Sequence, residues 1–266
     1  MNLNSSIIRI TERTLNFVDP RLMNHGRRVS YLIYRALRER GGHTLEEIRR
    51  LSLLGLLHDI GAYKSEEVDD MIRFESDHVW SHSIYGYLFI KHFSPLSAFA
   101  PAILFHHADC AELSYLHPSL RPAAQMLHAA DRFDFLLHTG GNDPDRIREH
   151  FKAGLGTEFM PEIVEMFFYN GWENTMGELE SDSGFQKLVY DSYMPHEDLR
   201  AYLEMLVLSI DFRSPQTVTH TIAASCACQP MSRIIGLSRA DEAQLHMGVM
   251  LHDIRKVGVP LPLQEN

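Results

Sequence analysis

Three observations predict an all-α fold for this chain of 266 residues. No stretch of any length alternates apolar and polar residues with the period of two that is typical of a half-buried strand. Apolar residues recur at helical spacing instead, and the pairs Gly41-Gly42 and Gly140-Gly141 mark helix ends. Helix-starting signals at Asp19-Pro20, Thr44 to Glu47 and Asp143-Pro144 precede these stretches. The length allows a substantial buried core.

The first two expected helices each deliver an imidazole. One runs from Asp19-Pro20 to Gly41-Gly42 and carries His25. The next starts at a Thr44 to Glu47 capping box and ends in an apolar run followed by His58-Asp59. Adjacent helix residues point about 100° apart, so this imidazole and carboxylate converge only on a shared point near the helix end. A metal ion is the simplest such object.

Later helices supply further candidate ligands. They are expected over Glu66 to Phe74, Asp77 to Phe93, Leu96 to Asp109, Pro122 to Leu137, onward from Asp143-Pro144, Glu158 to Tyr169, and Phe185 to Tyr193. These helices add His82, the pair His106-His107 and Asp131. Imidazole and carboxylate together suit Fe, Mn or Zn better than Ca or Mg. Any one of the 16 histidines taken alone is more often a hydrogen-bonded core residue, so the series as a whole carries the prediction.

The ordered series resembles the ligand series of the HD superfamily of metal-dependent phosphohydrolases, most closely its HD-GYP branch. The resemblance covers roughly residues 20 to 140 and implies an HD-domain helical bundle. It implies two divalent transition-metal ions, with Fe or Mn as the first candidates and Zn, Ni or Co as others. The implied metal ligands are His25, His58, Asp59, His82, His106, His107 and Asp131. Asp59 would bridge the two ions and accept a proton in catalysis.

The resemblance also implies residues that contact the substrate. Arg28, three residues after the first histidine, would hold a phosphate, with an ordinary solvated arginine as an equal alternative. The family usually has lysine three residues after the HD aspartate, where this chain has Ala62, so Lys64 is the candidate instead. Asp134, one turn after Asp131, would orient a ligand or touch a phosphate through water.

A partial internal repeat occupies the C-terminal part. From His25 to His58 is 33 residues, and from His220 to His252, again the first half of a His-Asp pair, is 32. Possible caps, Thr44 and Ser238, each precede the second histidine of their copy by 14 residues. We therefore expect an HD domain over residues 1–195 and a linker helix with a truncated second HD-GYP-like copy over 196–266. This copy lacks counterparts of the later ligands, so we expect a catalytically empty remnant that packs or dimerises.

Composition narrows the expected partners and location. The net charge of −10 argues against binding nucleic acid or an anionic membrane, although a metal site could still attract a phosphorylated or nucleotide substrate. Three poorly spaced cysteines fit a reducing cytoplasm, and the sequence has no signal-peptide core or membrane-length apolar run. The expected partners are a small phosphorylated substrate and, through the C-terminal half, a second copy of the chain.

The leading functional hypothesis is metal-dependent phosphohydrolysis with a metal-bound hydroxide as nucleophile. Within it, the resemblance suggests cyclic di-GMP. The Gly-Tyr-Pro motif that shapes the family's dinucleotide pocket is absent, because Ala108 to Glu112 follows the paired histidines. A second hypothesis is therefore a regulatory module that keeps the metal for structure or ligand sensing. A third is that the histidines only pack a helical bundle, which the ordered series disfavours.

Overall fold

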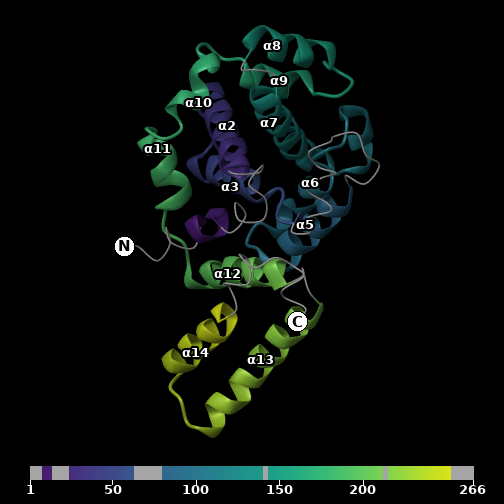
Figure 1. Cartoon of the computed structure of the whole chain (residues 1–266). Coiled ribbons are helices and arrows are strands. Elements are labelled where there is room, and N and C mark those ends of the chain that lie inside the picture. Colours follow the sequence, from purple (N-terminus) through teal and green to yellow (C-terminus); the bar gives the residue numbers. More distant parts are fainter. Residues whose placement is uncertain (1–7, 14–23, 63–79, 140–142, 212–214, 253–266) are drawn as a thin grey trace.

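The computed structural model confirms the all-α prediction. It describes residues 8–13, 24–62, 80–139, 143–211 and 215–252, and among these the one strand-like feature is an isolated bridge between Leu155 and Phe159. A helical bundle forms most of the molecule, α12 (His196–Asp211) lies along one end of it, and α13 (Pro215–Ile234) and α14 (Arg239–Leu251) project beyond α12 (Figure 1). No helix of the described residues is both long and apolar enough to cross a membrane.

Helices α2 (His25–Arg40), α3 (Leu45–Leu57) and α7 (Arg121–Thr139) form the centre of the bundle. Helix α7 is buried on nearly all sides, and α3 buries its whole apolar run from Leu53 to Leu57. Further α-helices of the bundle are α5 (Trp80–Phe93), α6 (Ala100–Leu104), α8 (Pro144–Ala153), α9 (Pro161–Phe167), α10 (Thr175–Glu178) and α11 (Ser183–Phe185). A turn of π-helix at Gln186–Tyr190 follows α11, so the helix expected over residues 185–193 is shorter and wider than predicted.

Local signals correctly located two helix starts. Thr44 accepts a hydrogen bond from the Glu47 amide while the Glu47 side chain accepts one from the Thr44 amide, which completes the capping box of α3. Asp143 caps α8 directly before Pro144. The helix expected over residues 66–74 lies outside the described residues.

Two expected boundaries are wrong, and both lie beside candidate ligands. The helix expected from Pro20 to Gly41 does not run unbroken, because Asn24 has a φ of 60° in the left-handed region, and α2 begins directly after it at His25. The helix expected over residues 96–109 ends at Leu104, so His106-His107 lies in the turn that follows α6. A turn frees the backbone from helical repeat, which allows two adjacent side chains to point toward one centre.

Two glycines let the ligand-bearing segments approach closely. A Cβ on Gly26 would lie 2.6 Å from the carbonyl oxygen of Leu56, so α2 meets the end of α3 at backbone contact. A Cβ on Gly61 would lie 2.0 Å from the carbonyl oxygen of His82, at the start of α5. Larger residues at either position would separate the segments that carry His25, His58 and His82.

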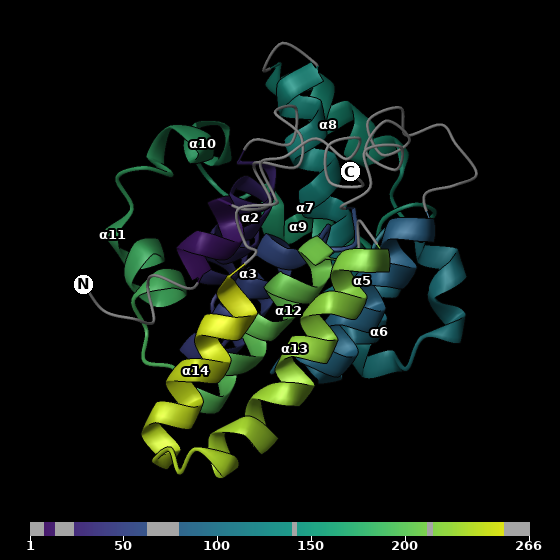
Figure 2. The ribbon, with the colours of Figure 1, turned by 60° about the horizontal axis from the view of Figure 1, so that its bottom comes forward.

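Helices α13 and α14 form an antiparallel hairpin (Figure 2). Within the described chain, the hairpin packs mainly against α12. Helix α12 itself belongs to the main core, since Met205 and Leu206 are fully buried in it. Several apolar side chains of the hairpin are exposed, among them Met231, Ile234 and Ile235. The domain boundary near residue 195 stays a prediction, as does the assignment of this hairpin to a truncated second HD-GYP-like copy.

Removing residues 214–266 is expected to leave the bundle folded and its metal content unchanged at the buried site. The reason is that α12 stays in place and the removed hairpin contributes little to the main core. The loss of exposed apolar residues such as Ile234 should also reduce self-association. Circular dichroism melting, Asp59-dependent metal content and light scattering test this. A truncated chain that unfolds or loses that metal would contradict it.

Candidate metal centre

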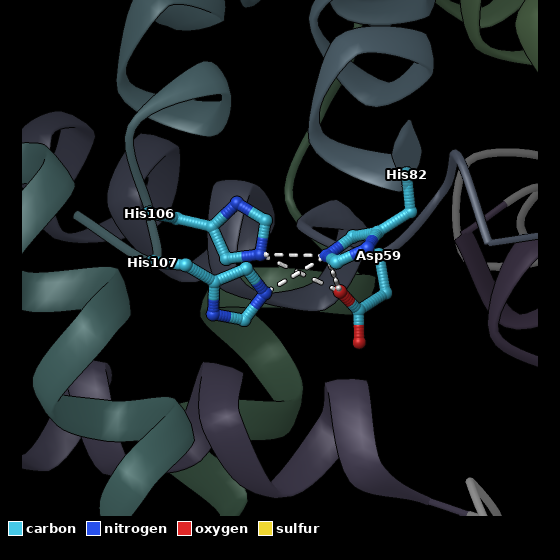
Figure 3. Close-up of side chains that lie close together, drawn as sticks. All are labelled: Asp59, His82, His106 and His107. Atoms are coloured by element: carbon cyan, nitrogen blue, oxygen red, sulfur yellow. Dashed lines mark hydrogen bonds and ion pairs between the residues drawn. The ribbon is translucent and has the colours of Figure 1, made fainter. Parts of the chain in front are cut away.

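Seven side chains that the sequence singled out meet in the middle of the bundle in two adjoining clusters. The first cluster consists of His25, His58 and Asp131. The second cluster consists of Asp59, His82, His106 and His107 (Figure 3). Within each cluster one potential ligand atom of every residue lies within 4.8 Å of the others. The side chains come from α2, the end of α3, α5, the turn after α6, and α7.

The carboxylate of Asp59 lies between the two clusters. Its Oδ2 faces the first cluster, 3.2 Å from His58 Nε2 and 3.5 Å from His25 Nε2. Its Oδ1 faces the second cluster, 3.6 Å from His106 Nε2 and 3.7 Å from His82 Nε2. Each oxygen of one carboxylate therefore serves a different group of imidazoles.

Backbone carbonyl groups fix which ring nitrogen of two histidines points inward. His58 Nδ1 lies 2.8 Å from the Gly55 carbonyl oxygen, and His106 Nδ1 lies 2.5 Å from that of Ile103. A carbonyl can only accept, so each Nδ1 carries the proton and donates, which leaves each Nε2 with its lone pair facing the cluster. Histidines that ligate a metal are held in this way.

A carboxylate performs the same task for His25. His25 Nδ1 lies 2.8 Å from Asp134 Oδ2, and Arg28 donates to both oxygens of Asp134 at 2.6 and 2.9 Å. Asp134 is 2% exposed, so this bidentate pair is largely desolvated. The pair orients His25 toward the cluster from behind. Arg28 was expected to hold a phosphate, whereas its described contact holds Asp134.

The donor set fits divalent metal ions. Both oxygens of Asp59 are buried, and neither accepts a hydrogen bond within the described part of the chain. The same holds for Oδ2 of Asp131. Imidazole nitrogens also face each other, with Nε2 to Nε2 distances of 3.3 Å for His25 and His58 and 3.4 Å for His82 and His106. Two imidazoles on one tetrahedral zinc have their nitrogens about 3.3 Å apart, and a 90° angle gives about 2.9 Å. Cations would satisfy both the carboxylates and the nitrogens.

Burial and charge set the protonation of these groups. Burial alone would raise the pKa of Asp59, but the surrounding imidazoles, His58 foremost, hold that pKa well below its usual range. Burial lowers the pKa of His82 to about 4, which keeps this ring neutral and able to ligate at neutral pH. Burial also lowers the pKa of His25, but the carboxylates of Asp131 and Asp134 outweigh it and raise that pKa well above its usual value.

The structure adds two residues that the sequence reasoning missed, Gln125 and His128 on α7. Both side chains are at most 1% exposed. His128 Nδ1 donates to the carbonyl oxygen of His106 at 3.0 Å, and Gln125 donates to the carbonyl oxygen of Ala108 at 3.1 Å. They brace the turn that carries the paired histidines. The sequence did carry a signal for them, because Gln125, His128 and Asp131 recur every three residues in a mostly apolar helix. Buried polar groups need hydrogen-bond partners, so such residues indicate contacts with another segment.

The remaining site predictions have mixed outcomes. Lys64, expected to contact substrate, lies outside the described residues. Ala108 to Glu112, the segment in the place of the absent Gly-Tyr-Pro motif, leads into a short 3₁₀ helix at Cys110–Tyr115 that Asp109 and Glu112 cap reciprocally. Asp134 was expected to orient a ligand or touch a phosphate. Its contact with His25 Nδ1 is that of a residue that orients a ligand.

Asp134→Asn is expected to weaken metal binding by about 10- to 100-fold, the usual cost of losing a partner behind a metal-bound histidine. Asparagine keeps the size of the side chain but loses the charge that Arg28 and His25 share. Competition with a chelator of known affinity measures the change. Asp145→Asn, an exposed aspartate in the first turn of α8, is the control and should bind metal like the wild type. Equal affinity in the two variants would contradict the role of Asp134.

Comparison with known proteins agrees with this geometry. Residues 22–136, which include all seven clustered side chains, match the model of the HD domain family. This match covers less than half of the chain, so membership of the HD superfamily of metal-dependent phosphohydrolases stays a prediction for the protein. The HD-GYP branch stays a prediction.

Two proteins described as from Vibrio cholerae are similar to this chain, one in sequence and one in fold. The chain is 24% identical over 268 residues to a 3'3'-cGAMP-specific phosphodiesterase 1 of that organism, covering 93% of this chain and 62% of the relative's length. A crystal structure described as a cyclic GMP-AMP-specific phosphodiesterase of V. cholerae (V-cGAP3) has the same fold, with a TM-score of 0.64 and 18% identity. That match covers 99% of this chain and 73% of the solved one.

Proposed function

We propose that this protein is a metal-dependent phosphodiesterase that hydrolyses a cyclic dinucleotide at a dinuclear centre. The observation that carries the proposal is the position of Asp59, whose two oxygens face two separate groups of imidazoles. A carboxylate so placed is suited to bridge two ions. Seven clustered ligands are also more than one ion in a catalytic site needs, because such sites keep a coordination position open.

The chain's own groups have distinct tasks in this proposal. His25, His58 and Asp131 would hold one ion, and His82, His106 and His107 the other. Two divalent ions held by these residues would polarise phosphoryl oxygens and would lower the pKa of a bound water to near neutral. Asp59 has a depressed pKa and stays ionised at neutral pH, so it neutralises part of the positive charge of the centre. The bracing by Gln125 and His128 limits movement of the paired histidines.

The similarity to cyclic GMP-AMP phosphodiesterases supports a cyclic dinucleotide as substrate. Cyclic di-GMP, the substrate suggested by the HD-GYP resemblance, has the same two-phosphate ring and differs in one base. The net charge of −10 would repel such a dianion from most of the surface. Binding would therefore depend on the metal centre and on residues immediately around it.

A regulatory module is the second candidate function, and the state of Arg28 favours it. Arg28 donates to both oxygens of the buried Asp134, so these donors are engaged in holding the site. The Gly-Tyr-Pro motif is absent as well. A protein that binds a cyclic dinucleotide on its metal without hydrolysing it would have these features.

Hydrolysis assays separate the two candidates. Protein stripped with a chelator and reloaded with Mn²⁺ or Fe²⁺ would be incubated with 3'3'-cGAMP, cyclic di-GMP and a chromogenic phosphodiester, and linear products resolved by chromatography. We expect metal-dependent opening of at least one cyclic dinucleotide, and no opening by Asp59→Asn. Metal-loaded protein that binds these dinucleotides but cleaves none of the three compounds would refute the enzymatic proposal in favour of the regulatory one.

A further inference from the structure

The loop between α8 and α9 closes on itself and is anchored in the core. Within its residues 154–160, a backbone bridge joins Leu155 and Phe159, and Gly156 turns the chain with a φ of 76°. The Phe159 ring is fully buried, with its centroid 5.2 Å from that of the His128 ring on α7. The loop therefore presents its backbone groups to α7 from a fixed position.

Backbone groups of this loop contact the segment that follows the paired histidines. The Glu158 carbonyl oxygen accepts hydrogen bonds from the amide of Cys110 at 3.0 Å and from the Gln125 side chain at 3.2 Å. The same Gln125 nitrogen donates to the Ala108 carbonyl at 3.1 Å, and the Gln125 oxygen accepts from the Met160 amide at 2.8 Å. Gln125 thus joins the loop to the turn that carries the paired histidines.

The Glu158 side chain reaches the same turn through His128. Glu158 Oε1 lies 3.5 Å from His128 Nε2, and the other ring nitrogen donates to the carbonyl oxygen of His106 at 3.0 Å. Both nitrogens of this buried ring face oxygens, which fixes its orientation from two sides. The same Glu158 oxygen lies 3.8 Å from Arg132 Nε and 3.9 Å from His150 Nε2. Burial alone would raise the pKa of Glu158, but these neighbours, His128 foremost, hold that pKa below its usual value, so the carboxylate is ionised at neutral pH.

We propose that Glu158 is a positioning residue for the second cluster. Its carboxylate orients His128, and His128 holds the carbonyl of His106, whose imidazole is a candidate ligand of the second ion. The first cluster is supported differently, because Asp134 orients His25. The inference rests on the proposed dinuclear centre and adds that its two ions have separate supports. Loss of the Glu158 side chain should therefore weaken the second ion and spare the first.

Metal binding by Glu158→Ala tests this selectivity. We expect the affinity for the second ion to fall by about 10-fold or more, the usual cost of losing a residue behind a metal ligand, while the first ion binds as in the wild type. Residue 158 keeps its carbonyl group, so the contacts with Cys110 and Gln125 remain and the loop should stay folded. Titration with Mn²⁺ against a chelator of known affinity measures both ions. Equal losses for the two ions, or no loss for either, would overturn the proposal.

Glu162→Ala is the matched control for this variant. Glu162 is an exposed glutamate in the first turn of α9, four residues after Glu158. It should bind both ions like the wild type.

A double variant shows whether Glu158 acts through His128. His128→Ala alone and the double variant of Glu158→Ala with His128→Ala should lose the same affinity for the second ion, because the carboxylate then has no ring to orient. Losses that add in the double variant would contradict this route.

Hydrogen exchange in the metal-free protein separates this inference from the proposed hydrolysis. Amides of residues 106–110 should exchange faster in Glu158→Ala than in the wild type or in Glu162→Ala. Unchanged exchange in this turn would overturn the positioning role, whatever the protein hydrolyses. Faster exchange, in a protein whose metal-loaded wild type cleaves no cyclic dinucleotide, would support the positioning role and refute the hydrolysis alone.

Discussion

Replacing Asp59 by asparagine is expected to reduce phosphodiester hydrolysis by about 10³-fold or more and to lower the affinity of both subsites for metal. The substitution keeps the shape of the side chain but removes the charge that faces both clusters. The Asp59 carboxylate lies between His58 of the first cluster and His106 of the second. Without its negative charge, two cations held by the clusters would repel each other more strongly. Initial rates at saturating metal and metal content after dialysis measure the two effects.

Asp109→Asn is the matched control for this variant. Asp109 also lies near the paired histidines, but it caps a short 3₁₀ helix and belongs to neither cluster. It should retain metal and turnover. Metal content and hydrolysis that stay at wild-type values in Asp59→Asn would reject the centre as described.

Replacing His82 or His106 by alanine is expected to remove one of two ions and to lower hydrolysis by about 10²-fold or more. Both rings belong to the second cluster, and their Nε2 atoms face each other at 3.4 Å. The first cluster keeps His25, His58 and Asp131 and should retain its ion. Metal counting by plasma mass spectrometry, together with rates, separates loss of one ion from loss of both.

An exposed histidine on the same helix provides the comparison. His92 lies in the last turn of α5, the helix that carries His82, and points to solvent. His92→Ala should hold two ions and hydrolyse normally. If His82→Ala also held two ions, or if the wild type held only one, the dinuclear assignment would be wrong while the helical bundle remained.

Local signals in the sequence predicted the helices well where the chemistry of one or two residues decides the outcome. The capping box at Thr44 and the proline after Asp143 are such cases, because the hydrogen bonds involved are made within one turn. The start of α2 was wrong because Asn24 has a left-handed conformation that the helix-start signal at Asp19-Pro20 does not indicate. The turn at His106-His107 was missed because its bracing comes from α7, far along the chain.

The candidate site shows the same division. The order of histidines and aspartates predicted which side chains gather, and the structure brings seven of them together. What the order could not show is the task of residues whose partners are distant in sequence. Arg28 and Asp134 are 106 positions apart, and only the packing of α2 on α7 shows that they hold His25 together.

The most direct test of the central claim is a crystal structure of the manganese- or iron-loaded protein with anomalous scattering. Two anomalous peaks about 3.5 to 4 Å apart are expected, one at each cluster, with one oxygen of Asp59 directed at each peak. A single peak within the first cluster, with His82 and His107 bound to no ion, would contradict the dinuclear centre on which the proposed hydrolysis rests.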